Sequence, residues 1–501
     1  MKSQLLSGLA LAGFSVLAFA EPLVDNAHDR VQTTFDPGKG FERIGTVAQR
    51  DVRSVGRSSL AIDCSMLPRG YGDFEQIKDY LPSLGVVRVR LHAGWAKLEP
   101  QPGVWDFAWL DRQVNWLFEH GLEPMLETSY GNPAYPDAGG ASLSDGMPRG
   151  EAALAAWDRY VEKLAERYPQ VKDWACWNEP NNIDANTPEI VVDNNIRTAQ
   201  IIRRHVPDAR IAMLTLGTNK MNAFTEACLK LFKERNAISL FHWIIYHDYS
   251  VNPDACFRSC VDDWAKIVRT YAPELKIWMG EAGATSDPHY SAGISSMKWN
   301  TELTQCKWNA RRQLSDLGHG YDSLLFTVYD PCYTDARRYC RKQPVYWVST
   351  RENCFMKRMG LLKCNDRLKV TKVKPAYYTM QNIASVFDAS VVAVQTAATC
   401  TSEAKGVVPT LYAFRRQDAG TPLFAYWNAA RHPDNDNRAS AATLALPSDC
   451  ALREPVIVDM VTGAIYAVPA ECVALEAGQA RYRLPIYDAP LLLTDKSLVI
   501  R

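Results

Sequence analysis

The sequence lacks the residue spacings that usually bind a zinc ion. It contains 13 cysteines and 9 histidines, but it has no C-x2-C pair and no H-E-x-x-H segment. Zinc sites in proteins are typically built from such closely spaced ligands. We therefore expect no metal site and no metal or organic cofactor.

The sequence also lacks an excess of either charge. Lys plus Arg and Asp plus Glu both number 56, and the two signs are scattered along the chain. A basic surface is the usual electrostatic mark of a nucleic-acid or anionic-membrane partner. We expect neither partner, and the sequence says nothing about the oligomeric state.

Long apolar runs are missing beyond the N-terminus. The one apolar run extends from Leu5 to Phe19, follows Lys2 and ends in Ala18-Phe19-Ala20. It is short for a membrane span of about 20 residues and has the small-residue cleavage pattern of a signal peptide. Residues 1–20 are thus predicted to be a signal peptide of a secreted or periplasmic protein without membrane insertion. A buried helix is the alternative.

The cysteine content favours disulfides, because disulfides persist in exported proteins. The odd count leaves at least one thiol unpaired within the chain. Cys176 is the candidate free thiol, since it lies in an apolar strand pattern. The candidate pairs, chosen for their closeness in sequence, are Cys256/Cys260, Cys332/Cys340, Cys354/Cys364 and Cys450/Cys472.

Short β-branched apolar runs alternate with helical patterns from about residue 58 to 330, which is typical of βα units around a parallel sheet. The clearest helical patterns cover Phe107–His120 and residues 151–167. Eight units and about 270 residues predict an α/β fold, a (β/α)₈ TIM barrel. A doubly wound open sheet is the rival, but it normally has a Gly-rich phosphate turn after its first strand, and none occurs. The predicted strands are Ser59–Cys64, Val86–Leu91, Leu122–Ser129, Val171–Asn178, Ala209–Gly217, Phe241–Tyr249, Lys276–Glu281 and Ser323–Asp330.

The C-terminal part has a different pattern. After residue 388 short strand-like stretches alternate with turn residues, and the tract from His432 to Asn437 is a strong loop signal. We predict a catalytic barrel over 58–388 and a C-terminal antiparallel β-sandwich over 389–501. Residues 21–57 are expected either to add strands to that sandwich or to cap the barrel floor.

Two glutamates end strands of the predicted barrel. Glu179 follows the fourth strand and Glu281 ends the seventh. Active sites of such barrels lie where the strands end, because the loops there converge over one cavity. Cleavage of a glycosidic bond needs two carboxylates, one to protonate the leaving oxygen and one to capture the sugar. For a retaining mechanism they should lie about 5–5.5 Å apart, which favours a proton on one of them.

Several strand-end segments together resemble clan A glycoside hydrolases, most closely glycoside hydrolase family 39 and its relatives. The resemblance covers the barrel well and the flanking regions loosely. The segments that carry it are Val89-Arg90, Trp95, Glu99-Pro100, Trp105-Asp106-Phe107, Tyr130-Gly131-Asn132-Pro133, Trp177-Asn178-Glu179-Pro180, His247-Asp248-Tyr249 and Gly280-Glu281.

The resemblance implies roles for the residues around the cleavage point. Carried over by position, Glu179 is the general acid/base and Glu281 is the nucleophile. Arg90 and Tyr249 are implied to hold the nucleophile ionised. Arg88 is the alternative to Arg90 if the strand register differs by one pleat.

The same resemblance implies a set of substrate contacts. Asn178 and His247 are expected to contact the sugar, although an isolated histidine beside an apolar strand is as often a core residue. Trp95 and Asn132 lie just beyond strand ends and are expected to bind substrate. The clan usually places a Trp on the eighth strand as the floor of the sugar subsite, and Tyr329 is the predicted substitute.

These observations predict a retaining glycoside hydrolase that acts on an oligosaccharide or polysaccharide. Two alternatives share the predicted fold. The first is a catalytically silent barrel that binds carbohydrate. The second is a transglycosylase that remodels an exopolysaccharide by passing the sugar to another sugar.

Overall fold

The computed structural model describes residues 31–143, 145–218, 220–287, 300–333, 355–476 and 478–499. The predicted signal peptide lies outside the described residues. Within them, no helix is long and apolar enough to cross a membrane.

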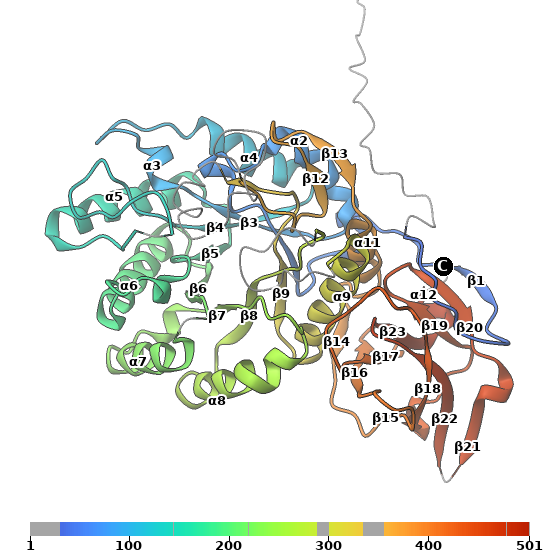
Figure 1. The fold of residues 1–501 in the computed structure, drawn as a ribbon. Coiled ribbons are helices and arrows are strands. Elements are labelled where there is room, and N and C mark those ends of the chain that lie inside the picture. The colour runs from blue at the N-terminus through green and yellow to red at the C-terminus, as the bar shows by residue number, and fades with distance from the viewer. Residues whose placement is uncertain are drawn as a thin grey trace, which may run out of the picture.

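Eight parallel strands form a closed barrel in the order of the chain, which confirms the predicted fold class (Figure 1). Each predicted strand overlaps one observed strand. The barrel strands are β2 (Leu60–Asp63), β3 (Arg88–His92), β4 (Glu123–Glu127), β5 (Asp173–Ala175), β6 (Arg210–Leu216), β7 (Trp243–His247), β8 (Lys276–Ala282) and β9 (Asp322–Leu325).

The interior of the barrel is filled by side chains, so that the barrel is a packed core and not a pore. Large and small side chains share this interior. The rings of Trp243 and Trp278 lie 5.1 Å apart between centroids, and alanines such as Ala175 and Ala212 belong to the same buried cluster. Trp278 therefore fills the barrel below its mouth.

Helices surround the barrel in the pattern that the sequence predicts (Figure 1). The predicted helices at Phe107–His120 and 151–167 are confirmed as α4 and α5. Thr187 and Pro188 show why α6 begins where it does: the Thr187 hydroxyl accepts a hydrogen bond from the Ile190 N–H, and Pro188 occupies the first turn. The main helices are α4 (Ala108–Glu119), α5 (Gly150–Arg167), α6 (Pro188–His205), α7 (Met221–Glu234), α8 (Asp262–Tyr271), α9 (Glu302–Gly318) and α11 (Pro375–Val386).

Short helical turns and two small hairpins complete the barrel domain. Residues 332–333 pair with residues 355–356, and residues 362–364 pair with residues 370–373. The sequence analysis did not predict these strands. These elements are α1 (Val52–Val55), α2 (Phe74–Ile77), α3 (Trp95–Leu98), β10 (Cys332–Tyr333), β11 (Phe355–Met356), β12 (Leu362–Cys364) and β13 (Val370–Val373).

The C-terminal part consists of antiparallel sheets, as predicted. One sheet has the strand order β1-β20-β19-β23-β17-β16-β14 and the other β15-β18-β22-β21. β1 (Arg43–Thr46) comes from the N-terminal segment and pairs with β20 (Ala464–Ala467). The other strands and the last helix are β14 (Val391–Ala393), β15 (Thr399–Thr401), β16 (Pro409–Arg416), β17 (Pro422–Asn428), β18 (Ser440–Pro447), β19 (Pro455–Asp459), β21 (Val473–Glu476), β22 (Gln479–Ile486), β23 (Leu491–Asp495) and α12 (Lys496–Val499).

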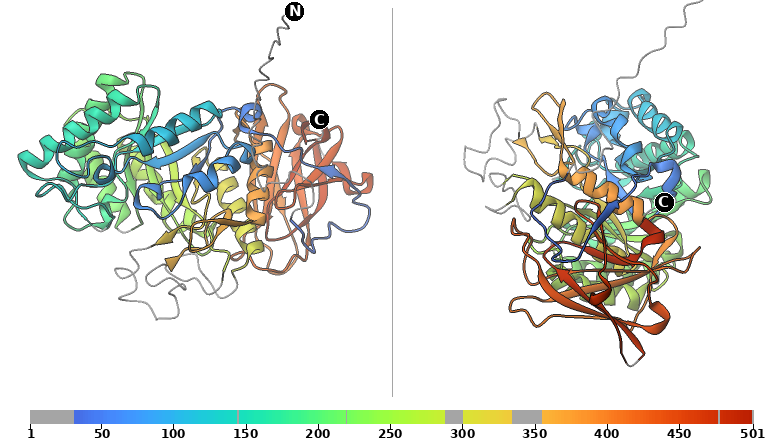
Figure 2. Two further views of the ribbon diagram at one scale, coloured as in Figure 1. Left: turned by 90° about the horizontal axis from the view of Figure 1, so that it is seen from above. Right: turned by 90° about the vertical axis from the view of Figure 1, so that its right-hand side faces the viewer.

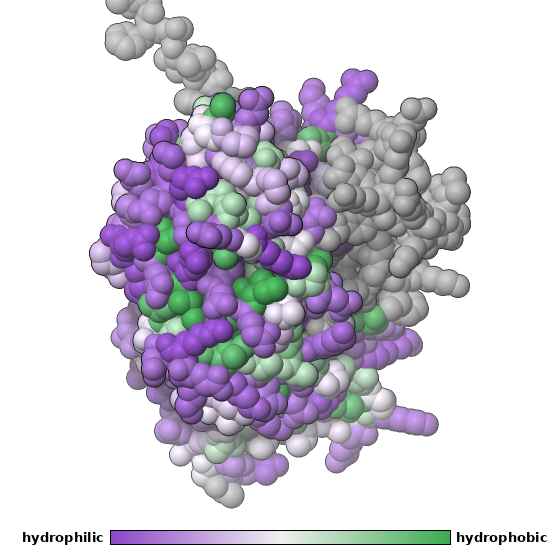
Figure 3. Space-filling view, turned by 90° about the vertical axis from the view of Figure 1, so that its left-hand side faces the viewer, coloured by the Kyte–Doolittle hydropathy of each residue, from purple (hydrophilic) through white to green (hydrophobic). Residues whose placement is uncertain are grey.

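The sandwich packs against α9 and α11 of the barrel (Figures 1 and 2). α9 is buried along nearly its whole length, including charged side chains. The Lys307 ammonium donates to the Asp488 carboxylate at 2.6 Å and to the backbone oxygens of Asp434 and Asp436 at 2.8 and 3.0 Å. The loop predicted at His432–Asn437 thus accepts hydrogen bonds from the barrel. The opposite side of the barrel shows mostly hydrophilic residues with scattered apolar ones (Figure 3).

Three of the four predicted cysteine pairs are wrong. Cys256, Cys260, Cys364, Cys450 and Cys472 are all free thiols. Cys256 immediately precedes the helical turn that holds Cys260, and residues four apart on a helix lie about 5–6 Å apart at Cβ, farther than the roughly 3.8 Å of a disulfide. Closeness in sequence therefore did not predict pairing.

Two further cysteine predictions have different outcomes. Cys176 is free and buried, as predicted. Cys332 is disulfide-bonded, but Cys340 and Cys354 lie outside the described residues. The predicted Cys332/Cys340 pair therefore stays a prediction.

Candidate active site

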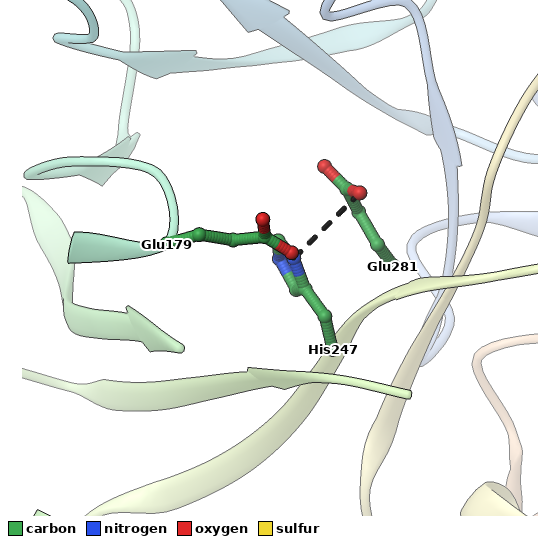
Figure 4. Close-up of side chains that lie close together, drawn as sticks. All are labelled: Glu179, His247 and Glu281. Carbon is green, nitrogen blue, oxygen red and sulfur yellow. Dashed lines mark hydrogen bonds and ion pairs between the residues drawn. The ribbon is translucent and has the colours of Figure 1, made fainter. Parts of the chain in front are cut away.

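The two predicted catalytic glutamates lie at the same end of the barrel and face each other (Figure 4). Glu179 follows β5 and Glu281 lies in β8. One carboxylate oxygen of each, together with a ring nitrogen of His247, forms a group whose atoms all lie within 4.8 Å of one another. Strands β5 and β8 therefore bring two acidic side chains, 102 residues apart in the chain, across a gap of the size of a sugar ring.

The backbone at Glu179 has a left-handed conformation with φ of 45°. Such a conformation is uncommon for a residue with a side chain and is often found at functional sites. Its N–H donates to the Thr215 oxygen of β6 at 2.7 Å, and Pro180 begins a short 3-10 turn after it. The chain thus follows β6 beyond the end of β5, through an isolated bridge between Asn178 and Thr215, and then turns at Glu179.

The Glu179 carboxylate has one partner on each oxygen. His247 Nδ1 lies 2.9 Å from Oε1, and the Asn182 amide donates to Oε2 at 2.8 Å. The side chain of Glu179 is partly exposed to solvent (13%), whereas His247 is buried (1%). Glu179 is thus oriented by two neighbours and remains accessible to a ligand.

The Glu281 carboxylate is held by stronger donors. Arg90 Nη1 donates to Oε1 at 2.6 Å, and the Tyr249 hydroxyl donates to Oε2 at 2.7 Å. Burial raises the pKa of Glu281, but His247, Arg90 and the hydrogen bonds outweigh it and lower this pKa to about 2. Glu281 is therefore ionised at neutral pH.

Arg90 is the centre of a buried charge network. Besides Glu281 it contacts Glu127, at 2.8 Å from Nη2, and Asp63, at 3.5 Å from Nη1. Its Nη2 also donates to the Asn178 side-chain oxygen at 2.7 Å. Burial raises the pKa of Asp63 to about 7 although Arg90 acts against this rise. One guanidinium thus orders three carboxylates and one amide beneath the site.

The structure places Arg88 elsewhere. Its Nη1 donates to the Asp322 carboxylate at 2.9 Å, and its guanidinium lies over the Trp278 ring, 4.5 Å from the centroid. Asp322 begins β9, so this contact lies toward the opposite end of the barrel. Arg90, and not Arg88, reaches Glu281.

The predicted substrate contacts divide into two groups. Asn178, His247 and Tyr249 lie beside the two glutamates. Both polar atoms of the Asn178 side chain have a partner within the protein, because its amide also donates to the Tyr130 hydroxyl at 2.7 Å. His247 contacts the carboxylates themselves, at 2.9 Å from Glu179 and 3.6 Å from Glu281.

The other three predicted contacts are not brought to the glutamates. The Trp95 indole donates to Glu99 at 2.8 Å, and the Asn132 amide donates to the Glu99 backbone oxygen at 2.8 Å. Both side chains are buried and belong to a cluster that fixes the loops after β3 and β4. The Tyr329 ring is buried and lies against Gly72, where even a Cβ atom would clash with it.

Phe326 is the aromatic residue of the eighth strand region that lies near Glu281. Its ring meets the ring of Tyr249 edge to face, 6.2 Å apart between centroids. Phe326 precedes Tyr329 by three residues and lies in the segment that the sequence analysis named, and the role of Tyr329 as the floor of the sugar subsite stays a prediction. Alternation along a strand does not predict which ring reaches the mouth once the strand has ended.

Four further residues of the site were missed. Glu127 and His92 end β4 and β3, and reading every strand end for acidic and basic side chains would have found them. His92 Nε2 lies 3.0 Å from Glu127, and the pKa of Glu127 lies well below its usual range because Arg90 and His92 outweigh its burial. Asp63 ends β2. Lys357 follows a cysteine-rich stretch without a periodic pattern, and no sequence signal indicates it.

Glu179, His247 and Glu281 also form the one group among the described residues whose spacing suits a metal ion. Carboxylate and imidazole are ordinary ligands of divalent metals. However, Arg90 already donates to Glu281 at 2.6 Å, and a guanidinium in that position repels a cation. The donor set fits proton transfer and nucleophilic attack better than metal binding.

Comparison with known proteins adds a local sequence match to this geometry. A β-galactosidase family model, glycoside hydrolase family 42, matches residues 73–141. β-Galactosidase BgaB of Geobacillus kaustophilus is 35% identical over 118 residues, which cover 20% of this chain and 17% of that protein. β-Galactosidase Bga of Halorubrum lacusprofundi is 30% identical over 104 residues, 17% of this chain and 15% of that protein. The chain therefore covers only about a sixth of the length of these curated relatives.

Solved structures match over most of the chain. A family 39 glycoside hydrolase from Bacteroides cellulosilyticus WH2 aligns with a TM-score of 0.60 at 15% identity, covering 87% of this chain and 81% of its own. The chain has the clan A glycoside hydrolase barrel fold. The predicted resemblance is thus confirmed for the fold.

Two more solved structures extend this likeness to the sandwich. The family 39 enzyme of Xanthomonas axonopodis pv. citri has a TM-score of 0.52 at 14% identity, and it covers 90% of this chain and 98% of its own. A β-xylosidase of Caulobacter crescentus CB15 has a TM-score of 0.51 at 14% identity over 90% and 97%. Because these alignments cover nine tenths of this chain, the likeness of fold extends beyond the barrel into the C-terminal sheets.

Proposed function

We propose that this protein is a retaining glycoside hydrolase that cleaves O-glycosidic bonds of an oligosaccharide or polysaccharide by double displacement. The observation that carries the proposal is the pairing of two carboxylates within 4.8 Å, only one of which is held ionised by an arginine and a tyrosine. That separation agrees with the short distance of retaining enzymes, since inverting enzymes need roughly 6.5–9.5 Å to place a water between the carboxyl groups.

In the first step, Glu281 attacks the anomeric carbon while Glu179 donates its proton to the leaving oxygen. The bond between the anomeric carbon and that oxygen breaks, and a glycosyl ester of Glu281 forms. With Glu281 ionised by Arg90 and Tyr249, Glu179 is the member of the pair that carries the proton. Its partial exposure lets it reach the leaving group.

In the second step, Glu179 acts as a base. It takes a proton from water, the water oxygen attacks the anomeric carbon, and the ester to Glu281 breaks. His247 contacts both carboxylates and is positioned to orient Glu179 as its charge changes between the two steps. The sugar is released with its original anomeric configuration, and Glu179 is protonated again.

The local match to β-galactosidases and the fold of family 39 enzymes agree with this proposal. They do not extend to the sugar or the linkage. We further propose that the protein acts outside the cytoplasm, because residues 1–20 have the sequence of a signal peptide.

Trapping of the covalent intermediate tests the proposal. A panel of 2-fluoro glycosides with activated leaving groups should give an intact-mass increase of one fluorosugar, mapped by peptide sequencing to Glu281. Binding of sugars without an adduct from any of them would favour the silent carbohydrate-binding barrel. An adduct together with products longer than the substrate would favour the transglycosylase.

A further inference from the structure

Lys357 reaches the candidate active site from outside the barrel strands. Lys357 follows β11, and its backbone is fixed there, since its N–H donates to the Pro331 oxygen at 2.9 Å and its own oxygen accepts from Met359 at 2.9 Å. Its ammonium lies over the rings of Tyr249 and Phe326, 5.4 and 5.3 Å from their centroids. Tyr249 is the residue that donates to Glu281.

The ammonium of Lys357 has no hydrogen bond or ion pair to another residue in the described ranges. Aromatic faces attract a cation, and the ring of Tyr333 lies 5.9 Å away as a third face. Rings do not supply the oxygen acceptors that the three N–H donors of an ammonium require. The half-buried side chain is therefore held in place by the rings, and its N–H donors are left for water or for a ligand.

Two neighbouring cations behave differently. Arg358 donates to Asp330 at 3.1 Å, and Lys374 donates to the same carboxylate at 2.7 Å. Asp330 is fully buried and serves both. Lys357 lies next to Arg358 in sequence but on the side of the segment that faces Glu281, where no described carboxylate lies within 4 Å of its ammonium.

The nucleophile does not need Lys357 as a direct partner. Each oxygen of Glu281 already has a short hydrogen bond, from Arg90 and from Tyr249. The charges of Glu281 and Glu179 act on Lys357 only at longer range, where they oppose the lowering of its pKa by burial. An anionic group of a ligand would supply the oxygen acceptors and the charge that the site lacks.

We infer that Lys357 binds an acidic substituent, a carboxylate or a sulfate ester, on the sugar that Glu281 attacks, so that the natural substrate is an acidic polysaccharide. This inference rests on the proposed function. It assigns to Lys357 a role in substrate specificity, and it places the acidic sugar on the side of the cleaved bond that becomes attached to Glu281. Phe326 and Tyr249 would contact the same sugar through their rings.

Matched pairs of polysaccharides test this inference. The wild-type protein is assayed for new reducing ends on uronic-acid polysaccharides and on the same polymers after chemical reduction of their carboxyl groups. Sulfated polysaccharides and their desulfated forms provide the second arm. We expect cleavage of at least one acidic polymer, with a rate at least about tenfold above that of its neutral form, because a charge-assisted hydrogen bond is lost in the neutral one.

Three variants assign the preference to the residue. In Lys357→Met the ratio of the rates on the acidic and the neutral polymer should fall from at least about tenfold to about one. Lys357→Arg should keep most of the preference. Lys363→Met removes an exposed lysine of β12 and should behave as wild type. Thermal unfolding of each variant checks that the fold is retained.

The outcomes separate the two proposals. Cleavage of neutral polymers only, or an equal loss on acidic and neutral polymers in Lys357→Met, overturns the role of Lys357 and leaves the hydrolase proposal intact. An equal loss would instead indicate that Lys357 acts through the charges of the glutamates. Absence of both cleavage and a fluorosugar adduct on every substrate overturns the proposed function, and this inference with it.

Discussion

Two arginines of the same strand show how the two ends of the barrel differ. Arg88 and Arg90 both lie on β3, two residues apart, and both are buried. Arg88 meets one carboxylate, that of Asp322, and the face of Trp278. Arg90 is shared by Asp63, Glu127 and Glu281. The same type of side chain thus neutralises one carboxylate at one end of the barrel, and it orders a cluster of carboxylates at the other end, where barrel active sites lie.

The comparison predicts that changes around Arg90 alter catalysis and that changes around Arg88 alter stability. The largest effect is expected for Glu281→Gln, which keeps the shape of the side chain and removes the nucleophile. kcat/KM should fall by roughly 10⁵-fold, measured on an activated aryl glycoside. Unchanged circular dichroism would show that the fold is retained, whereas full activity would refute the assignment of Glu281.

The loss of activity in Glu179→Gln should depend on the leaving group of the substrate. Loss of the proton donor should reduce cleavage of an ordinary glycoside by about 10²–10⁴-fold, because the leaving oxygen must depart as an anion. A dinitrophenyl glycoside needs no proton and should react in its first step at close to the wild-type rate. Equal losses on both substrates would contradict the role of Glu179 as the acid.

Arg90→Lys should lower kcat by about 10²–10³-fold. A lysine keeps the positive charge but cannot contact Glu281, Glu127 and Asn178 at once, because it lacks the planar fork of donors. Steady-state kinetics and thermal unfolding on the same preparation separate the loss of geometry from a loss of folding. A variant with wild-type kcat would show that charge alone orders the cluster.

Tyr249→Phe should have a smaller effect and a specific pH signature. It removes one hydrogen bond to a charged oxygen, which predicts a loss of roughly 10-fold. The pKa of Glu281, about 2 in the native protein, should rise toward its usual value. Because the reaction needs ionised Glu281, activity should then be lost at a higher pH on the acid side. An unchanged acid limb would contradict the contribution of Tyr249.

Arg88→Met is expected to have the smallest effect on catalysis. It removes the arginine from the half-buried Asp322 and leaves the Trp243 indole, at 3.0 Å, and the Ser59 side chain as its donors, so the free energy of unfolding should fall by about 2 kcal/mol. kcat/KM should stay within about twofold of wild type at a temperature where the variant is folded. A loss of activity without a loss of stability would contradict the claim that Arg88 supports folding and not catalysis.

Much of the fold could be predicted because its signals are local. Each barrel strand is a short apolar run, and helices such as α4 have a regular apolar stripe, so periodicity suffices. Glu179 and Glu281 could be predicted for the same reason, since a residue at the end of a parallel barrel strand is placed by the topology.

The remaining site could not be predicted because it depends on direction and on distant contacts. Trp95 and Asn132 follow strand ends, yet their polar atoms bond to Glu99 and not to the cleft. Tyr329 and Phe326 are three residues apart in the sequence, and only the three-dimensional course of the chain after β9 decides which ring lies beside Tyr249. Lys357 follows β11, which pairs with β10, and each of these strands has only two residues. Strands this short leave no pattern in the sequence.

The burial of Lys307 in α9 has a consequence for how this protein can be divided. A barrel cut off at residue 388 would lose Asp488 and the backbone oxygens that receive this ammonium, and it would expose to water a helix whose every side has evolved to be covered. The C-terminal sheets therefore support the barrel, and the two parts of the protein should unfold together.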